Sequence, residues 1–128
     1  TARELGAEVN VQDAGADSKE QISQIEYFIS KQMDVIVVIP IDGDALYDVV
    51  KEAKDKGIYV ICYDRIVGNI NADLYITIDN EKVGTLMGEA LIQACPAGGN
   101  IFAIMVLLQI KMWMKLCEGL TKLWREAI

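Results

Sequence analysis

Residues 34–39 read DVIVVI and residues 58–63 read IYVICY, two continuous apolar runs rich in β-branched and aromatic side chains. Such runs are typical of strands covered on both faces, as in parallel sheets. Between them, one apolar stripe recurs at helical spacing: Leu46, Val49, Val50 and Ala53. Gly57 suits the position after a helix end. The stretch therefore predicts a strand–helix–strand unit, which decides the fold.

The same alternation continues toward the N-terminus. Residues 8–12 (EVNVQ) alternate and predict a strand, and residues 13–17 predict a turn. Ser18 and Gln21 form a possible capping box, with Ser18 as the helix cap. A helical stripe follows it: Ile22, Ile25, Phe28 and Ile29.

Toward the C-terminus, residues 66–73 predict a polar loop and residues 74–78 (LYITI) a short strand. A helix capped at residue 79 or 80 follows. Residues 96–99 end this helix, and residues 101–105 begin a further strand.

Strands that alternate with helices predict an α/β fold with a largely parallel sheet. Ligands of such folds bind outside the carboxyl ends of the strands. This rule directs attention to Asp13, residues 40–44 and residues 63–65.

Composition excludes several classes of function. The 128 residues (14.2 kDa) carry a net charge of −7, which disfavours binding to nucleic acid. There is no histidine, so zinc sites of the Cys/His type and Ser-His-Asp triads are excluded within this chain. No apolar run approaches the roughly 20 residues of a membrane helix.

No catalytic machinery is recognisable in the sequence. Cys62, Cys95 and Cys117 are widely spaced and form neither a CxxC pair nor a disulfide framework. Gly98 and Gly99 lack the Lys and Ser/Thr that follow in a phosphate-binding loop. We therefore expect a non-enzyme with no cofactor and no metal site.

Asp64 and Arg65 directly follow a predicted strand, where a ligand would bind. This pair suits a polyhydroxylated ligand, because the carboxylate can accept a hydrogen bond from one hydroxyl while the guanidinium fork donates to two neighbouring oxygens. The alternative is that Asp64 caps a turn and Arg65 is a surface charge. The residues alone favour that alternative.

Three other carboxylates follow predicted strands. Asp42 and Asp44 flank Gly43 and could form a metal or phosphoryl site, but their position before a helix favours a capping role. Asp13, two residues before Gly15, is best explained as a turn residue. It is kept as a weaker ligand-site candidate.

Residues 1–105 resemble the N-terminal lobe of the periplasmic sugar-binding proteins of bacterial ABC importers (periplasmic binding protein type I). The most specific matches are YDR at 63–65, DLYI at 73–76 and DNEKVG at 79–84, and DVIV at 34–37 adds to them. The first and third together are most similar to the xylose-binding branch. The resemblance implies a Rossmann-like three-layer α-β-α lobe, of which this chain holds an incomplete part.

The resemblance also implies a function. Two lobes close around a monosaccharide, here a xylose-like pentose, and deliver it to the permease subunits of an importer. Asp64 and Arg65 would contact the sugar hydroxyls. The location would be periplasmic or extracytoplasmic, with a lipid anchor possible and no membrane insertion. Two alternatives are a sugar sensor for a membrane receptor kinase and the effector core of a lactose-repressor-like transcription factor.

Two departures from the family pattern are expected to affect the fold. The family has an opening strand between the strands at residues 8–12 and 34–39, and this chain begins after it. The resemblance also stops at Met105. If one G was lost at codons 105–106, restoring it shifts the reading frame, and the following codons can then read GSPTDKNVDE. This sequence fits the family's hinge. We therefore expect a partial lobe at 1–105 and an out-of-frame tail at 106–128, the alternative being a genuine divergent helix.

The frameshift hypothesis has a direct test. Resequencing codons 104–107 in the parent gene should reveal a one-base deletion, followed in the restored frame by a second α/β lobe. An intact reading frame would contradict the hypothesis and make the tail a real segment.

Overall fold

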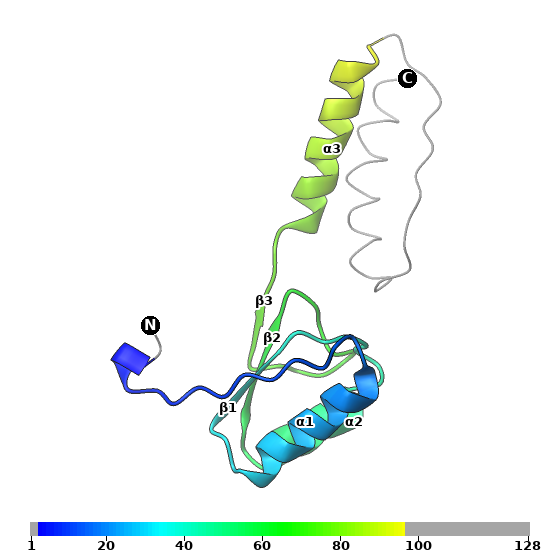
Figure 1. The fold of residues 1–128 in the computed structure, drawn as a ribbon. Coiled ribbons are helices and arrows are strands. Elements are labelled where there is room, and N and C mark those ends of the chain that lie inside the picture. Colours follow the sequence, from blue (N-terminus) through cyan, green and yellow to red (C-terminus); the bar gives the residue numbers. More distant parts are fainter. Residues whose placement is uncertain (1–2, 97–128) are drawn as a thin grey trace. The chain divides into compact units, whose positions relative to one another are not determined.

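The computed structural model describes residues 3–96, which are divided between two compact units at Ile76 and Thr77. The first unit begins with a short 3-10 helix, η1 (Arg3–Leu5), and contains a sheet with two α-helices. The described part of the second unit is the helix α3 (Asn80–Ala94). The strand predicted at 101–105 and the tail predicted at 106–128 lie outside the described residues (Figure 1).

A parallel sheet forms the centre of the first unit, as predicted. Its strands are β1 (Val35–Val38), β2 (Tyr59–Tyr63) and β3 (Leu74–Ile76), in the order β1-β2-β3. Val35 pairs with Tyr59, and Ile61 pairs with Leu74. Strand β3 ends two residues earlier than predicted, because β2 stops at Tyr63, the partner of Ile76.

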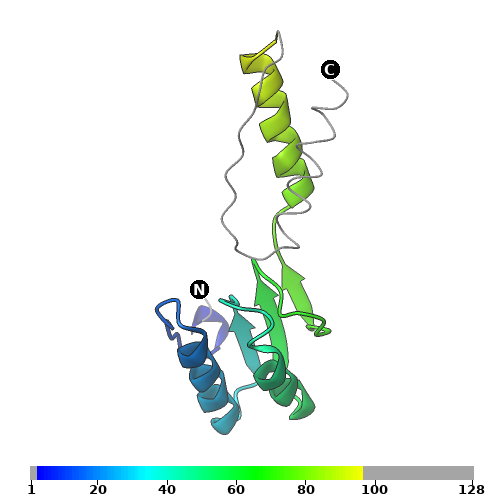
Figure 2. The same cartoon turned by 90° about the vertical axis from the view of Figure 1, so that its right-hand side faces the viewer.

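The helices α1 (Ser18–Ser30) and α2 (Tyr47–Asp55) pack side by side against one face of this sheet (Figure 2). Their apolar stripes meet the inward-facing side chains of β1 and β2, as the sequence spacing predicts. The buried core contains Ile25, Ile29, Ile36, Val38, Leu46, Val49, Val50, Ala53, Ile58, Val60, Cys62 and Val67. The helical stripe at 46–53 is therefore confirmed as core. In the stripe at 22–29, Ile25 and Ile29 belong to the core, and Ile22 and Phe28 are partly buried against it.

The opposite face of the sheet is apolar but exposed. Val37 and Tyr59 keep 62% and 64% of their surface accessible, and Val35 and Tyr63 are exposed too. The expectation that these strands are covered on both faces is therefore wrong for the described part of the chain. The strands carry apolar side chains on both faces of the sheet, which led to this expectation. In the first unit, helices cover one of these faces.

The strand predicted at residues 8–12 is also absent. This segment has no regular secondary structure, and its Val9 and Val11 are exposed. A strand exists only when its backbone groups pair with a neighbour. Among the described residues, no strand pairs with residues 8–12 or with the outer edge of β1. The alternation of apolar and polar residues at 8–12 was therefore not sufficient evidence for a strand.

The cap of α1 lies one residue earlier than predicted. Asp17, not Ser18, is the N-cap, and its carboxylate accepts from the N–H groups of Lys19 (2.8 Å) and Glu20 (3.4 Å). A carboxylate here also suits the positive end of the helix dipole. The predicted capping box of Ser18 and Gln21 is therefore absent. The Gln21 amide instead donates to the Ile39 carbonyl and accepts from the Ile41 N–H, both at 2.9 Å.

The expectation that Asp42 and Asp44 cap the following helix is wrong, because the N-cap of α2 (Tyr47–Asp55) is Leu46 and no side chain caps it. Asp44 contributes its backbone carbonyl, which accepts from the Tyr47 N–H at 3.3 Å. Asp42 caps the preceding turn instead. Its carboxylate accepts from the N–H groups of Asp44 (3.0 Å) and Ala45 (3.1 Å), within a turn that precedes α2. The helix itself begins at Tyr47. Gly57 follows the end of α2 at a φ of +82°, the left-handed conformation that glycine adopts without a steric penalty.

Helix α3 begins as predicted, with Asp79 as its N-cap accepting from the Lys82 N–H at 2.9 Å. It ends at Ala94, shortly before Pro96. Gly84 and Gly88 are its buried residues. Within residues 3–96, no helix is long and apolar enough to cross a membrane.

Asp73 closes the loop that joins β2 to β3. Its carboxylate accepts from the Lys54 ammonium and from the Val60 N–H, both at 2.8 Å. Its own N–H donates to the Val60 carbonyl at 2.9 Å. The hydrogen bond from Lys54, followed by that from Val60, lowers the pKa of the Asp73 carboxyl. This contact fixes where β3 starts beside β2.

The lowered pKa of Asp73 predicts a pH dependence of stability. The ionised carboxylate stabilises the fold above its unfolded pKa of about 3.9, and this contribution is lost as pH falls through the lower, folded pKa. The difference in free energy of unfolding between the parent and Asp73→Asn should therefore be largest near neutral pH and shrink below about pH 4. Urea titrations from pH 3 to 7 measure it. Asp48→Asn, an exposed change on α2, is the control, and a difference independent of pH would contradict the prediction.

Candidate functional site

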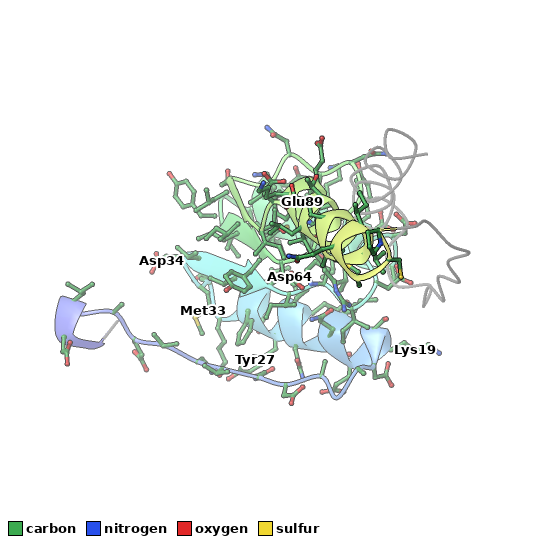
Figure 3. The ribbon with its side chains drawn as sticks, turned by 90° about the horizontal axis from the view of Figure 1, so that it is seen from above. Lys19, Tyr27, Met33, Asp34, Asp64 and Glu89 are labelled. Atoms are coloured by element: carbon green, nitrogen blue, oxygen red, sulfur yellow. The ribbon has the colours of Figure 1, made fainter. Side chains whose placement is uncertain are left out.

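Asp64 and Arg65 lie where the carboxyl end of β2 meets solvent. Figure 3 looks down on the carboxyl ends of the strands, and Asp64 lies at this end of the sheet. The two side chains keep 46% and 25% of their surface accessible. Both candidates are thus at the edge of the sheet where parallel α/β folds bind ligands.

A tight turn holds these two residues. The Arg65 N–H donates to the Tyr63 carbonyl at 2.7 Å, and Asp64, between them, has a φ of +63°. A non-glycine residue in this region is uncommon, although aspartate tolerates it better than most. The Asp64 N–H donates to the Ile76 carbonyl at 2.7 Å. The turn is therefore fixed at the end of β3 as well as at the end of β2.

The Arg65 guanidinium holds an unused hydrogen-bond donor. Its Nε is buried and has no hydrogen-bond partner among the described residues. The Asp64 carboxylate lies nearby, with Oδ2 3.9 Å from Nε, which is an ion pair but too long for a hydrogen bond. A buried donor without an acceptor costs about 1–3 kcal/mol. A ligand oxygen at this position would remove the cost.

A donor and an acceptor side by side suit a polyhydroxylated ligand. Ionised carboxylates only accept and guanidinium groups only donate, so the pair can bind the hydrogen and the oxygen of neighbouring hydroxyls. Hydrogen bonds to charged groups are also about twice as strong as neutral ones. The alternative interpretation, a simple turn cap, does not account for the buried Nε.

A second loop packs against the segment that follows the turn. The Gly68 N–H donates to the Gly43 carbonyl at 3.1 Å. A Cβ built on Gly43 would lie 2.5 Å from the Ile66 carbonyl oxygen, so only glycine fits there without a shift of the backbone. The loops after β1 and β2 are therefore in contact at the carboxyl edge of the sheet.

The other acidic candidates serve local structure. Asp42 caps its turn, as described above. Asp13 accepts from the Gly15 N–H at 2.9 Å, and its carbonyl accepts from the Gln24 amide at 3.1 Å. The turn interpretation of Asp13 is thereby supported. Within residues 3–96, no cluster of acidic or cysteine side chains could hold a metal ion.

Two residues at this edge were missed by sequence reasoning. Gln21 joins α1 to the backbone after β1, and the Tyr75 hydroxyl donates to the Asp64 carbonyl at 3.2 Å. Tyr75 belongs to the DLYI stretch at 73–76, but alternation in a short strand gives no indication of such a bond. Both contacts depend on tertiary packing, which the sequence pattern does not report.

Comparisons with known proteins agree with this architecture. A model of the periplasmic binding protein domain matches residues 1–123. The D-xylose-binding periplasmic proteins of Haemophilus influenzae and Escherichia coli are 46% and 48% identical to this chain over 97 residues. These residues are 76% of this chain and 29% of each relative, so the chain spans less than a third of their length.

A solved structure shows the same relationship in three dimensions. The solute-binding protein of an ABC transporter from Clostridium phytofermentans, with bound β-D-glucose, superposes with a TM-score of 0.83 at 30% identity. The match covers 98% of this chain and 40% of that protein. The predicted resemblance and fold class are therefore confirmed.

The joined loops give a stability prediction. Gly43→Ala should lower the free energy of unfolding by about 1–3 kcal/mol, because its methyl group meets backbone that must move. Gly68→Ala should cost less, since its Cβ would meet the Asp44 carboxylate at 2.6 Å, and a side chain can rotate away. Chemical denaturation of both variants checks this. Equal losses of unfolding free energy in the two variants would contradict the proposed packing. Adding Asp44→Ala should restore stability to Gly68→Ala but not to Gly43→Ala.

Proposed function

Because the chain belongs to the periplasmic binding protein domain family, we propose that it forms part of one lobe of a protein that binds a monosaccharide between two lobes. Asp64 and Arg65 are its sugar-contacting residues. The observation that supports this role most directly is the buried Arg65 Nε without an acceptor, at the carboxyl edge of the sheet. Asp13 stays a weaker candidate for the same site, since its carboxylate already accepts within its own turn.

The proposed ligand is a xylose-like pentose. The two relatives at 46% and 48% identity are both named for D-xylose. The Clostridium phytofermentans protein, at lower identity, is named with glucose, a hexose. The chemistry of the Asp64–Arg65 pair suits any sugar with neighbouring hydroxyls, so the preference for xylose is inferred from the relatives and not from the pair.

The proposed setting is import across a membrane. A binding protein of this kind delivers its sugar to permease subunits and works in the periplasm or outside the cytoplasmic membrane. The name of the solved Clostridium structure includes an ABC transporter, which supports this setting. Binding and release require no covalent chemistry, which agrees with a non-enzymatic role.

A chimaera tests the function in a complete two-lobed protein. The 97 matching residues of this chain replace the corresponding segment of the Escherichia coli D-xylose-binding protein, and calorimetry measures binding of D-xylose. We expect binding by the chimaera and a loss of about 10- to 100-fold in affinity for Asp64→Asn, since a charged hydrogen bond contributes about 1.5–3 kcal/mol. Arg65→Lys should lose a comparable amount, because lysine keeps the charge but lacks Nε and the fork.

The matched control is Asp34→Asn, which removes an exposed carboxylate directly before β1, at the amino end of that strand. Its affinity should equal that of the unsubstituted chimaera. A folded chimaera in which Asp64→Asn and Arg65→Lys bind D-xylose as tightly as the control would overturn the assignment of the site.

A further inference from the structure

The Asp64 turn depends on strand β3 for both of its peptide groups. The Asp64 N–H donates to the carbonyl of Ile76, and the Asp64 carbonyl accepts from the hydroxyl of Tyr75 at 3.2 Å. The first contact is between backbone atoms and follows from strand pairing. The second contact comes from the Tyr75 side chain, so a residue without a hydroxyl at this position would not provide it.

We propose that Tyr75 is a positioning residue of the sugar site, whose hydroxyl holds the Asp64 peptide so that Asp64 and Arg65 face the ligand together. This inference rests on the function proposed above and adds a residue to it. Tyr75 needs no contact with the sugar for this role. It acts on the backbone that joins the two contacting side chains.

The backbone of Asp64 explains why such a hold is needed. A φ of +63° is unfavourable for a residue with a side chain, and strained residues persist when their surroundings over-determine them. Rotation about the N–Cα bond of Asp64 would relieve this strain, and it would move the Asp64 carbonyl and change the direction of the Arg65 side chain. A hydrogen bond to the Asp64 carbonyl opposes this rotation.

The position of Tyr75 fits a local role better than a role in the core. It pairs with Cys62 in the register of β2 and β3, yet 41% of its surface is accessible and it is not part of the buried core. Removing its hydroxyl leaves the ring in place and removes no buried apolar surface. We therefore expect an effect on the site that exceeds the effect on stability.

The main experiment is Tyr75→Phe in the chimaera described above. D-xylose affinity should fall three- to tenfold, while the thermal midpoint changes no more than in Tyr59→Phe. Tyr59 is the matched control, since it is a more exposed tyrosine on β2. In a double-mutant cycle, Tyr75→Phe should cost less than twofold when Asp64→Asn is already present, because coupled residues are not additive.

A second measurement keeps the fold intact. Replacing Tyr75 by difluorotyrosine lowers the pKa of the phenol without changing its shape. Affinity for D-xylose should then fall as pH rises through this pKa, because a phenolate cannot donate to the Asp64 carbonyl. With the same replacement at Tyr59, the affinity for D-xylose should not change over this pH range.

Each result decides the proposal. If Tyr75→Phe binds like Tyr59→Phe while Asp64→Asn weakens binding, the sugar site stands and the role of Tyr75 is overturned. If Asp64→Asn and Arg65→Lys bind normally, the proposed function fails and the role of Tyr75 fails with it. A Tyr75→Phe chimaera that does not fold, together with a flat pH profile for the fluorinated protein, assigns Tyr75 to structure alone and also overturns the proposal.

Discussion

The parallel pairing of β2 with its neighbours is the constraint on which the candidate site depends. Among the described strands, β2 lies between the other two, and its Val60 and Cys62 are fully buried. The pairing ends where Tyr63 meets Ile76, and the next residue turns at a positive φ. The last backbone pair of the sheet therefore places the turn that carries Asp64 and Arg65.

The same sheet has two very different faces. Its inner face packs against α1 and α2, and its outer face leaves Val35, Val37 and Tyr59 accessible within the described part of the chain. Exposed apolar sheet surface and unpaired strand edges favour association between molecules. We therefore consider a complete two-lobed protein the appropriate setting for measurements of sugar binding, since the chain spans 29% of the length of its xylose-binding relatives.

Sequence reasoning predicted the elements whose signal is local. The apolar stripes of α1 and α2, the runs that became β1 and β2, and Gly57 after α2 all follow from spacing and backbone preference. The prediction for residues 8–12 failed because a strand requires a partner, which alternation cannot reveal. The cap of α1 was misplaced by one residue because Asp17 and Ser18 are both good caps.

The candidate site was predictable in part for a similar reason. Asp64 and Arg65 follow a buried strand, so the rule for parallel sheets and the family resemblance both indicated them. Tyr75 and Gln21 could not be found in this way, because their contacts join residues 11 to 20 positions apart. The buried, unpaired Nε of Arg65 was likewise invisible in the sequence, since it depends on how the turn folds.

The most direct test of the central claim is a crystal structure of the chimaera with bound D-xylose. The account predicts a sugar oxygen within hydrogen-bond distance of Arg65 Nε and a sugar hydroxyl donating to the Asp64 carboxylate. A bound sugar that contacts neither side chain, with Arg65 Nε still lacking an acceptor, would contradict it.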